Sequence, residues 1–124
     1  MSKTVIVVLS DPNAGEESVG RLFNALAVAS DLDRRGQPVT VEFAGAGTRW
    51  PGVVTRPDHP VNALYRSVSH LVGGASCGCA DVFGARADVE RAGVALLTTN
   101  AVPGTSGLVG LADHVLGGDR VLTF

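Results

Sequence analysis

Two cysteines separated by one glycine are the residues best suited to chemistry in this 124-residue sequence, and they are its only cysteines. Cys77 and Cys79 follow a predicted strand and precede a predicted helix, where free backbone N–H groups and the helix dipole favour an anion over a neutral thiol. Such a setting suits a nucleophile that takes sulfur from a persulfide, or a redox thiol. Because unpaired cysteine is among the most buried residue types, inert packing is the alternative.

A metal or a nucleotide cofactor finds little support in the sequence. His59 and His70 are the histidines nearest to the cysteines, and their spacing matches no recognised zinc motif. Gly45-Ala46-Gly47 lacks the third glycine of a dinucleotide fingerprint, and no phosphate loop follows the first predicted strand. We therefore expect neither a metal nor a cofactor.

Five strands are predicted from the hydrophobic pattern. Residues 5–9 form an unbroken apolar run rich in β-branched residues, which is typical of a strand buried on both faces. Residues 38–44 alternate apolar and polar side chains and end at a glycine pair. Shorter apolar runs at 70–73, 94–98 and 121–124 complete the set.

Four helical stretches separate these strands. Residues 16–35 carry apolar side chains at helical spacing, with acidic residues at the start, basic residues at the end and a glycine stop. The second helix follows residues 57–60 and the third covers 80–92, interrupted at Gly84. The fourth begins after residues 103–106 and places His114 toward solvent.

Strands that alternate with helices predict a mostly parallel sheet with right-handed crossovers. The predicted fold is a single α/β domain over residues 1–124, a three-layer α/β/α sandwich of flavodoxin-like type. Ligands of such sheets gather at the carboxyl ends of the strands. This edge directs attention to Asn13, Trp50, Ser76, Gly78 and Asn100 as ligand-binding candidates beside the cysteines, with Trp50 as a pocket wall or a subunit contact.

Composition restricts the partners. Ten Lys and Arg against twelve Asp and Glu give a net charge of −2 with no basic stripe, which argues against nucleic-acid binding. No apolar run approaches the length of a membrane span and no signal peptide is evident, so we expect a cytoplasmic protein without a membrane partner. An apolar share of 45% with only 18% charged residues suggests that self-association covers some apolar surface.

The arrangement of motifs resembles the DsrE/DsrF-like family, which has the YchN-like fold. The resemblance spans nearly the whole chain: residues 45–50, then 57–60 before a helix, then 74–84 around the cysteines, then 120–124. It implies a small α/β subunit in homotrimers or homohexamers, with members that carry a persulfide on a loop cysteine. By that register Cys79 matches a second family cysteine, Ser76 stands where the first would be, and Cys77 is displaced.

Two functional hypotheses follow. In the first, Cys77 or Cys79 receives a sulfane sulfur from a donor protein and holds it for an acceptor protein, as a sulfurtransferase-type carrier or in thiol redox chemistry, with the other cysteine able to resolve the adduct. In the second, the protein is a non-catalytic homo-oligomeric subunit that binds a small ligand or acts as a scaffold. The sequence alone names neither the donor nor the acceptor.

Overall fold

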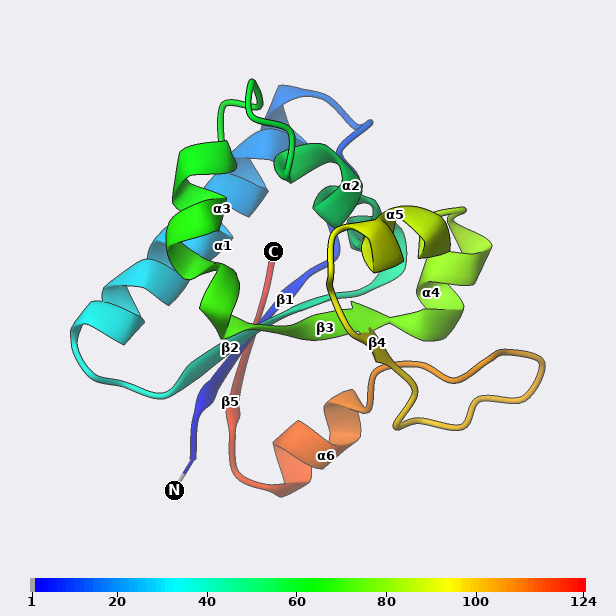
Figure 1. Ribbon diagram of the computed structural model, residues 1–124. Coiled ribbons are helices and arrows are strands. Elements are labelled where there is room, and N and C mark those ends of the chain that lie inside the picture. Colours follow the sequence, from blue (N-terminus) through cyan, green and yellow to red (C-terminus); the bar gives the residue numbers. More distant parts are fainter. Residues whose placement is uncertain (1) are drawn as a thin grey trace.

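Five strands form one parallel sheet in the computed structural model, which describes residues 2–124 (Figure 1). The strand order is β4-β3-β2-β1-β5, and every neighbouring pair is parallel. The strands are β1 (Thr4–Val8), β2 (Val39–Phe43), β3 (Val72–Ser76), β4 (Leu96–Leu97) and β5 (Arg120–Thr123). The predicted mostly parallel five-stranded α/β fold is confirmed.

Six α-helices and two short 3-10 helices connect the strands. The α-helices are α1 (Glu16–Arg34), α2 (Trp50–Val54), α3 (Asn62–Val68), α4 (Cys77–Val82), α5 (Arg86–Arg91) and α6 (Leu111–Leu116). The 3-10 helices are η1 (Gly45–Arg49) and η2 (Ser69–Leu71). The first predicted helix is confirmed almost residue for residue, and Gly84, with φ of 67°, separates α4 from α5 as predicted.

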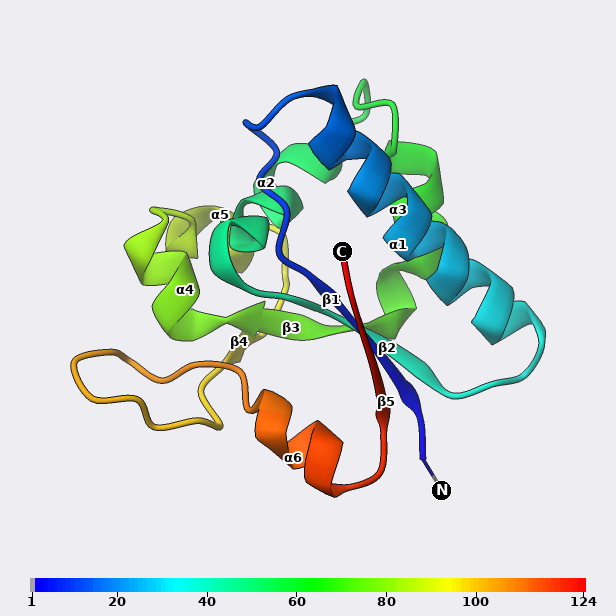
Figure 2. The same cartoon turned by 180° about the vertical axis from the view of Figure 1, so that it is seen from behind.

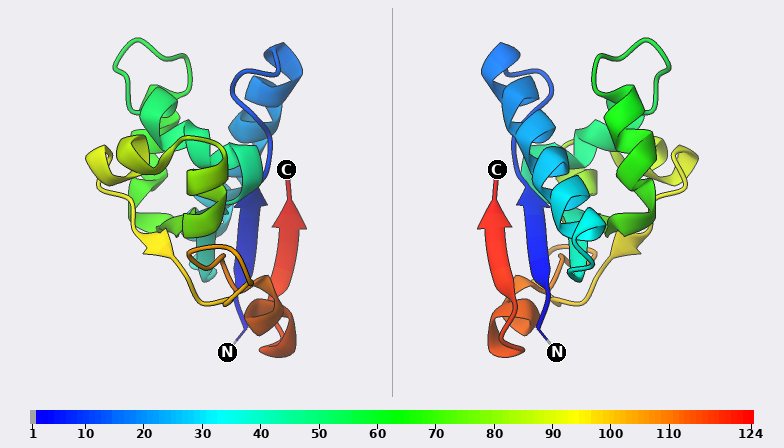
Figure 3. Two further views of the ribbon diagram at one scale, coloured as in Figure 1. Left: turned by 90° about the vertical axis from the view of Figure 1, so that its right-hand side faces the viewer. Right: turned by 90° about the vertical axis from the view of Figure 1, so that its left-hand side faces the viewer.

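The two faces of the sheet are covered unequally. From β1 to β4, each new strand is added at the same edge of the growing sheet. Right-handed crossovers therefore place α1, α2, α3 and α5 on one face (Figures 1 and 2). The connection from β4 returns past β1 to β5, which puts α6 on the opposite face. The side views show β1 and β5 side by side and pointing in the same direction (Figure 3). The second helical layer is therefore a single short helix.

The main core lies between the sheet and the α1 face. Its largest fully buried side chains include Ile6, Leu22, Phe43 and Trp50. Trp50 is 0% exposed and its indole Nε1–H donates to the Ser10 carbonyl oxygen at 2.8 Å. The expectation that Trp50 walls a pocket or makes a subunit contact is therefore wrong. A tryptophan in this apolar core buries its ring and satisfies its one donor on the backbone.

Some predicted element boundaries are displaced. The third strand begins two residues later than expected and runs through Ser76, because parallel pairing with β2 and β4 holds its glycines and alanine in extended conformation despite their weak strand propensity. The last helix begins at Leu111, since Pro103, Gly104 and the later glycines keep residues 98–110 in a long loop. The helices η1 and α2 were not predicted.

His114 is also placed differently from the prediction. Its side chain is only 17% exposed, and it lies against the sheet and not toward solvent. Nε2 lies 2.9 Å from the Glu42 carboxylate of β2, and Nδ1 lies 3.3 Å from that of Asp119. Because Glu42 has a side chain only 8% exposed, it requires a polar partner, and α6 supplies it. These contacts attach the lone helix of the second layer to the sheet.

Candidate functional site

Cys77 and Cys79 lie in the first turn of α4, directly after β3, and not in the loop predicted between strand and helix. No loop separates strand from helix: Ser76 still has extended dihedral angles, and the helix begins at the next residue, Cys77. Gly78 permits a close approach at this turn. A Cβ atom on Gly78 would lie 3.1 Å from the Gly107 carbonyl oxygen and 3.2 Å from Cβ of Thr105.

Two side chains from other elements reach the sulfur of Cys77. Nη2 of Arg86, from α5, lies 3.0 Å from Sγ, and Oγ of Ser106, from the 98–110 loop, lies 3.2 Å from it. Cys77 itself is 3% exposed, whereas Ser106 is exposed. The guanidinium places a positive charge and an N–H donor beside the sulfur, and hydrogen bonds between ionised partners are the stronger ones.

Asp81 completes a cluster of four side chains around this sulfur. Its carboxylate accepts from Nε of Arg86 at 2.6 Å, from Nη2 of Arg86 at 2.9 Å and from Oγ of Ser106 at 2.7 Å. The hydrogen bonds from Arg86 and then Ser106 lower the pKa of Asp81 to about 2. Asp81 in turn raises the pKa of Arg86, with a further contribution from the charge of Cys77. Asp81 is therefore an anion at neutral pH and too weak a base to deprotonate a thiol.

Residues 98–110 hold Ser106 over the site. Asn100 and Leu108 form an isolated antiparallel bridge with two backbone hydrogen bonds of 2.8 Å, which closes the loop that carries Ser106. The backbone N–H of Gly78 donates to the Gly107 carbonyl oxygen at 2.7 Å. The loop consequently lies against α4 at this point.

These contacts change one expectation about the cysteines. We expected backbone N–H groups at the start of the helix to hold the thiolate, but that of Gly78 is already bonded to the loop. The described groups within hydrogen-bond distance of the Cys77 sulfur are side chains, those of Arg86 and Ser106. Stabilisation of the sulfur thus depends on tertiary contacts and not on the helix alone.

Cys79 has a different environment. It is partly exposed and no hydrogen bond to its sulfur is found within residues 2–124. Residues two apart on a helix point to different sides, and two cysteines whose Cβ atoms point apart cannot form a disulfide without backbone movement. As α4 is folded, Cys79 is not placed to resolve an adduct on Cys77.

A hollow of about 260 Å³ adjoins the cluster between α4 and the loop. Two members of the cluster, Asp81 and Ser106, border this hollow. Its lining residues are Gly78, Asp81, Val82, Gly104, Thr105 and Ser106. Val82 is 74% exposed at this position. The hollow thus reaches the side chains that contact the sulfur, whereas Cys77 itself does not line it.

Among the other residues predicted from the sequence, Gly78 lies at this site and the rest do not join it. Asn13 is exposed in the turn after β1, and Asn100 contributes its backbone to the bridge of the loop. Ser76 is fully buried, and its Oγ accepts the backbone N–H of Val109 at 3.1 Å, which anchors the end of the loop. Gly78 lies in the site as the point of close approach.

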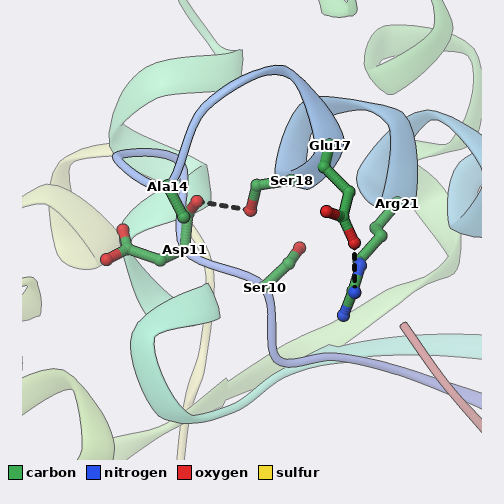
Figure 4. A pocket seen from close by; sticks show the side chains of 6 residues that line it. All are labelled: Ser10, Asp11, Ala14, Glu17, Ser18 and Arg21. Carbon is green, nitrogen blue, oxygen red and sulfur yellow. Dashed lines mark hydrogen bonds and ion pairs between the residues drawn. The ribbon is translucent and has the colours of Figure 1, made fainter.

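A second cleft lies at the carboxyl end of β1, where the chain order of the sheet reverses between β1 and β5. Figure 4 shows its wall at the start of α1, with Ser18 donating to the Asp11 carbonyl and Arg21 paired with Glu17. The hydroxyl oxygen of Ser10 is buried there without a partner. The volume is about 290 Å³ and the lining residues are Ser10, Asp11, Ala14, Glu17, Ser18 and Arg21. It holds no nucleophile comparable to Cys77.

Within residues 2–124, no three His, Cys, Asp or Glu side chains are placed to hold a metal ion together. None of the helices in that range combines the length and the apolar character needed to span a bilayer.

Sequence reasoning missed three of the four side chains in the cluster. Asp81 lies four residues after Cys77, a spacing that places two side chains on one helix face, and this signal could have been used. Arg86 follows across the Gly84 break, and its direction depends on how α5 turns. Ser106 has no local signal, because only the folded loop brings it to the sulfur.

Comparison with known proteins identifies the fold of this chain through similar solved structures. No family model and no curated protein matches the sequence. A conserved protein of unknown function from Bacteroides thetaiotaomicron superposes with a TM-score of 0.66 at 15% identity, over 98% of this chain and 95% of that chain. The YchN protein of E. coli superposes with a TM-score of 0.61 at 23% identity, over the full length of both chains. The chain has the YchN-like fold.

The YchN-like fold agrees with the resemblance drawn from the sequence motifs, and at these identities the likeness concerns architecture alone. What the protein does must be argued from its own side chains, and the cluster around Cys77 is the strongest argument it offers.

Proposed function

We propose that this protein is a cytoplasmic sulfur carrier in which Cys77 accepts a sulfane sulfur, holds it as a persulfide and passes it to an acceptor. The observation that supports the proposal most is the pair of donors, Arg86 and Ser106, within 3.2 Å of the Cys77 sulfur. Donors of this kind stabilise a thiolate before attack and a persulfide anion afterwards.

The proposed reaction is balanced without an external oxidant. The Cys77 thiolate attacks the outer sulfur of a donor persulfide, the donor's S–S bond breaks, and a new S–S bond forms on Cys77. The donor leaves as a thiolate and takes up the proton that Cys77 gave up. Transfer to an acceptor thiolate repeats the exchange in reverse. Cys79 has no required role, because the helix points it away from Cys77.

Access to Cys77 is the main demand on this proposal, because the residue is 3% exposed. The hollow beside α4 ends at Ser106, an exposed side chain on a loop without charged residues between positions 92 and 112. The proposal therefore requires the Ser106 side chain to move outward before a donor reaches the sulfur. Loops of this kind carry much of the motion that active sites need.

Persulfide loading tests the proposal. Reduced protein is incubated with a small persulfide donor, and the intact mass is followed for the wild type, Cys77→Ser and Cys79→Ser. We expect a gain of one sulfur, reversible with a reducing thiol, in the wild type and Cys79→Ser but not in Cys77→Ser. No gain in any of the three proteins would reject the carrier function.

A non-catalytic ligand-binding subunit is the second candidate, and one observation favours it. The cleft at the carboxyl end of β1 lies where the chain order reverses, the usual ligand position in open α/β sheets, and it contains the unpaired hydroxyl of Ser10. Native mass spectrometry of gently purified protein would show a bound small molecule if this candidate is correct. Loss of that species in Ser10→Val would assign the cleft.

Self-association is part of the proposal. Large apolar side chains on several surfaces are exposed: Leu9, Phe23, Val82, Val115, Leu116 and Leu122. Leu116 is the most exposed of them at 85%, on the only helix of the second layer. We expect copies of the chain to associate through this thinly covered side, as a homotrimer or homohexamer.

A further inference from the structure

The hydrogen atoms around Cys77 can be counted from the chemistry of its neighbours. Nη2 of Arg86 carries two hydrogens, and three acceptors lie within reach of it: Oδ2 of Asp81 at 2.9 Å, the Cys77 sulfur at 3.0 Å and, more distant, Oγ of Ser106 at 3.4 Å. Both hydrogens are therefore in use whether Cys77 is a thiol or a thiolate. When Cys77 ionises, Arg86 therefore has no additional hydrogen to donate to the sulfur.

Ser106 differs because it has one hydrogen and two acceptors. Its Oγ lies 2.7 Å from Oδ2 of Asp81 and 3.2 Å from the Cys77 sulfur, so the hydroxyl can donate to only one of them at a time. With a neutral thiol, every group is satisfied in a chain. The thiol donates to Oγ of Ser106, and Ser106 donates to Asp81.

Ionisation of Cys77 removes the first donor from this chain and creates a second acceptor for the Ser106 hydrogen. If the hydroxyl turns away from Asp81, Oδ1 still accepts from Nε of Arg86 and Oδ2 still accepts from Nη2. Each carboxylate oxygen therefore keeps a donor. The thiolate gains a charge-assisted bond, which is stronger than a neutral one. Rotation about the Cβ–Oγ bond is all that the exchange requires.

We infer that Ser106 is a positioning residue whose hydroxyl switches its acceptor from Asp81 to the Cys77 sulfur when Cys77 ionises. The 98–110 loop, which is far from Cys77 in sequence, thereby supplies a hydrogen-bond donor to the ionised sulfur. This inference rests on the proposed function in taking Cys77 as the nucleophile.

The remaining charged groups near the sulfur are accounted for. Arg86 comes from α5 and Asp81 from α4, while the loop and β3 present no charged side chain to it. Arg49 of η1, which packs on α4, is paired with Asp11 at 2.9 Å and is bonded to the Phe83 carbonyl. The hydroxyl of Ser106 is thus the movable donor in this environment.

Alkylation with iodoacetamide across a pH series tests the inference. The proteins are Cys79→Ser, which leaves Cys77 as the only thiol, and the same protein with Ser106→Ala or Ser106→Thr. Loss of one hydrogen bond worth about 1 kcal/mol should raise the alkylation midpoint in Ser106→Ala by roughly 0.7 pH unit, and Ser106→Thr should restore it.

The plateau rate at high pH separates ionisation from coverage of the sulfur. A faster plateau in Ser106→Ala with an unchanged midpoint would mean that Ser106 only covers Cys77, and this result would overturn the inference. A midpoint that threonine does not restore would also overturn it. Because no persulfide is present in this assay, its outcome is independent of whether the protein accepts sulfur.

Discussion

At the scale of single residues, the cluster of Cys77, Asp81, Arg86 and Ser106 concentrates the chemistry of the molecule. The sulfur is buried, but its partners are reachable from solvent, since Asp81 and Arg86 retain 41% and 42% side-chain exposure. An anion on sulfur is therefore stabilised by groups that need not be desolvated to the same degree. A buried sulfur with exposed polar partners suits a thiol that reacts with a partner and is otherwise protected from oxidation.

Replacement of Asp81 should have a pH-dependent effect on stability. The folded-state pKa of Asp81 is about 2, below the ordinary 3.8, so its contribution is fully present above 3.8 and is lost as the pH falls toward 2. The difference in unfolding free energy between the wild type and Asp81→Asn should accordingly shrink across that interval. Denaturant titrations at several pH values measure it, and a constant difference down to pH 2 would contradict the assignment.

The residues of the site were only partly predictable. The two cysteines stand out in the sequence because they are the only ones and follow a strand. Arg86 and Ser106 do not stand out, since an arginine beyond a helix break and a serine in a loop each have many ordinary roles. Trp50 was misjudged for the opposite reason, because its rarity suggested function while its size placed it in the core.

At the scale of elements, the close packing of the 98–110 loop on α4 controls access to the sulfur. Gly78 allows this approach, because a side chain there would press against the Gly107 carbonyl oxygen and Thr105. The order of β3 and α4 fixes Cys77, and the loop then brings Ser106 to it. Element order thus creates the site that residue types alone do not define.

Gly78→Ala should loosen this contact. The added Cβ would lie 3.1 Å from the Gly107 carbonyl oxygen, so the loop must shift, and we expect a several-fold faster alkylation plateau for Cys77. Gly20→Ala in α1 is the matched control, because nothing lies within 4 Å of its added Cβ. Equal plateau rates in the two variants would show that the loop does not limit access.

Helix α6 provides a stability prediction. His114→Leu removes the partner of Glu42, whose side chain is 8% exposed, and an uncompensated buried charge costs about 3–5 kcal/mol. Adding Glu42→Leu should recover much of that loss, because the unpaired charge is removed with it. Urea unfolding measures both, and a single variant as stable as the wild type would show that the contact contributes little.

Elements were predicted best where the apolar pattern was long. The 19-residue helix α1 and the strand at β1 follow directly from periodicity and caps. The sequence did not reveal that β3 continues to Ser76, since glycine and alanine carry weak strand signals. It also did not reveal the short helix α2, which begins at the tryptophan and proline of residues 50–51.

At the scale of the whole molecule, the two faces of the sheet differ, because several helices cover the α1 face and α6 alone covers the opposite face among residues 2–124. The succession of strands and helices predicted a parallel sheet, because right-handed crossovers allow few alternatives. The position of β5 beside β1 was not predictable, since it depends on which edge the last connection reaches. In that edge position, Leu122 of β5 stays 41% exposed.

Association should proceed through the face that α6 covers. Light scattering after size exclusion should give a mass that is a multiple of the 124-residue monomer, and Leu116→Glu should reduce it by placing a charge on the most exposed apolar side chain. Phe23→Glu, on α1 of the opposite face, should leave the assembly intact. The reverse pattern would place the interface on the α1 face.

The most direct measurement of the central claim is the location of the sulfur after loading. Wild-type protein is treated with a persulfide donor, freed of donor, alkylated and digested, and the peptides that contain residues 77–79 are sequenced by mass spectrometry. The extra sulfur should be found on Cys77. Its presence on Cys79 alone, with Cys77 alkylated only as a thiol, would contradict the assignment of Cys77 as the carrier.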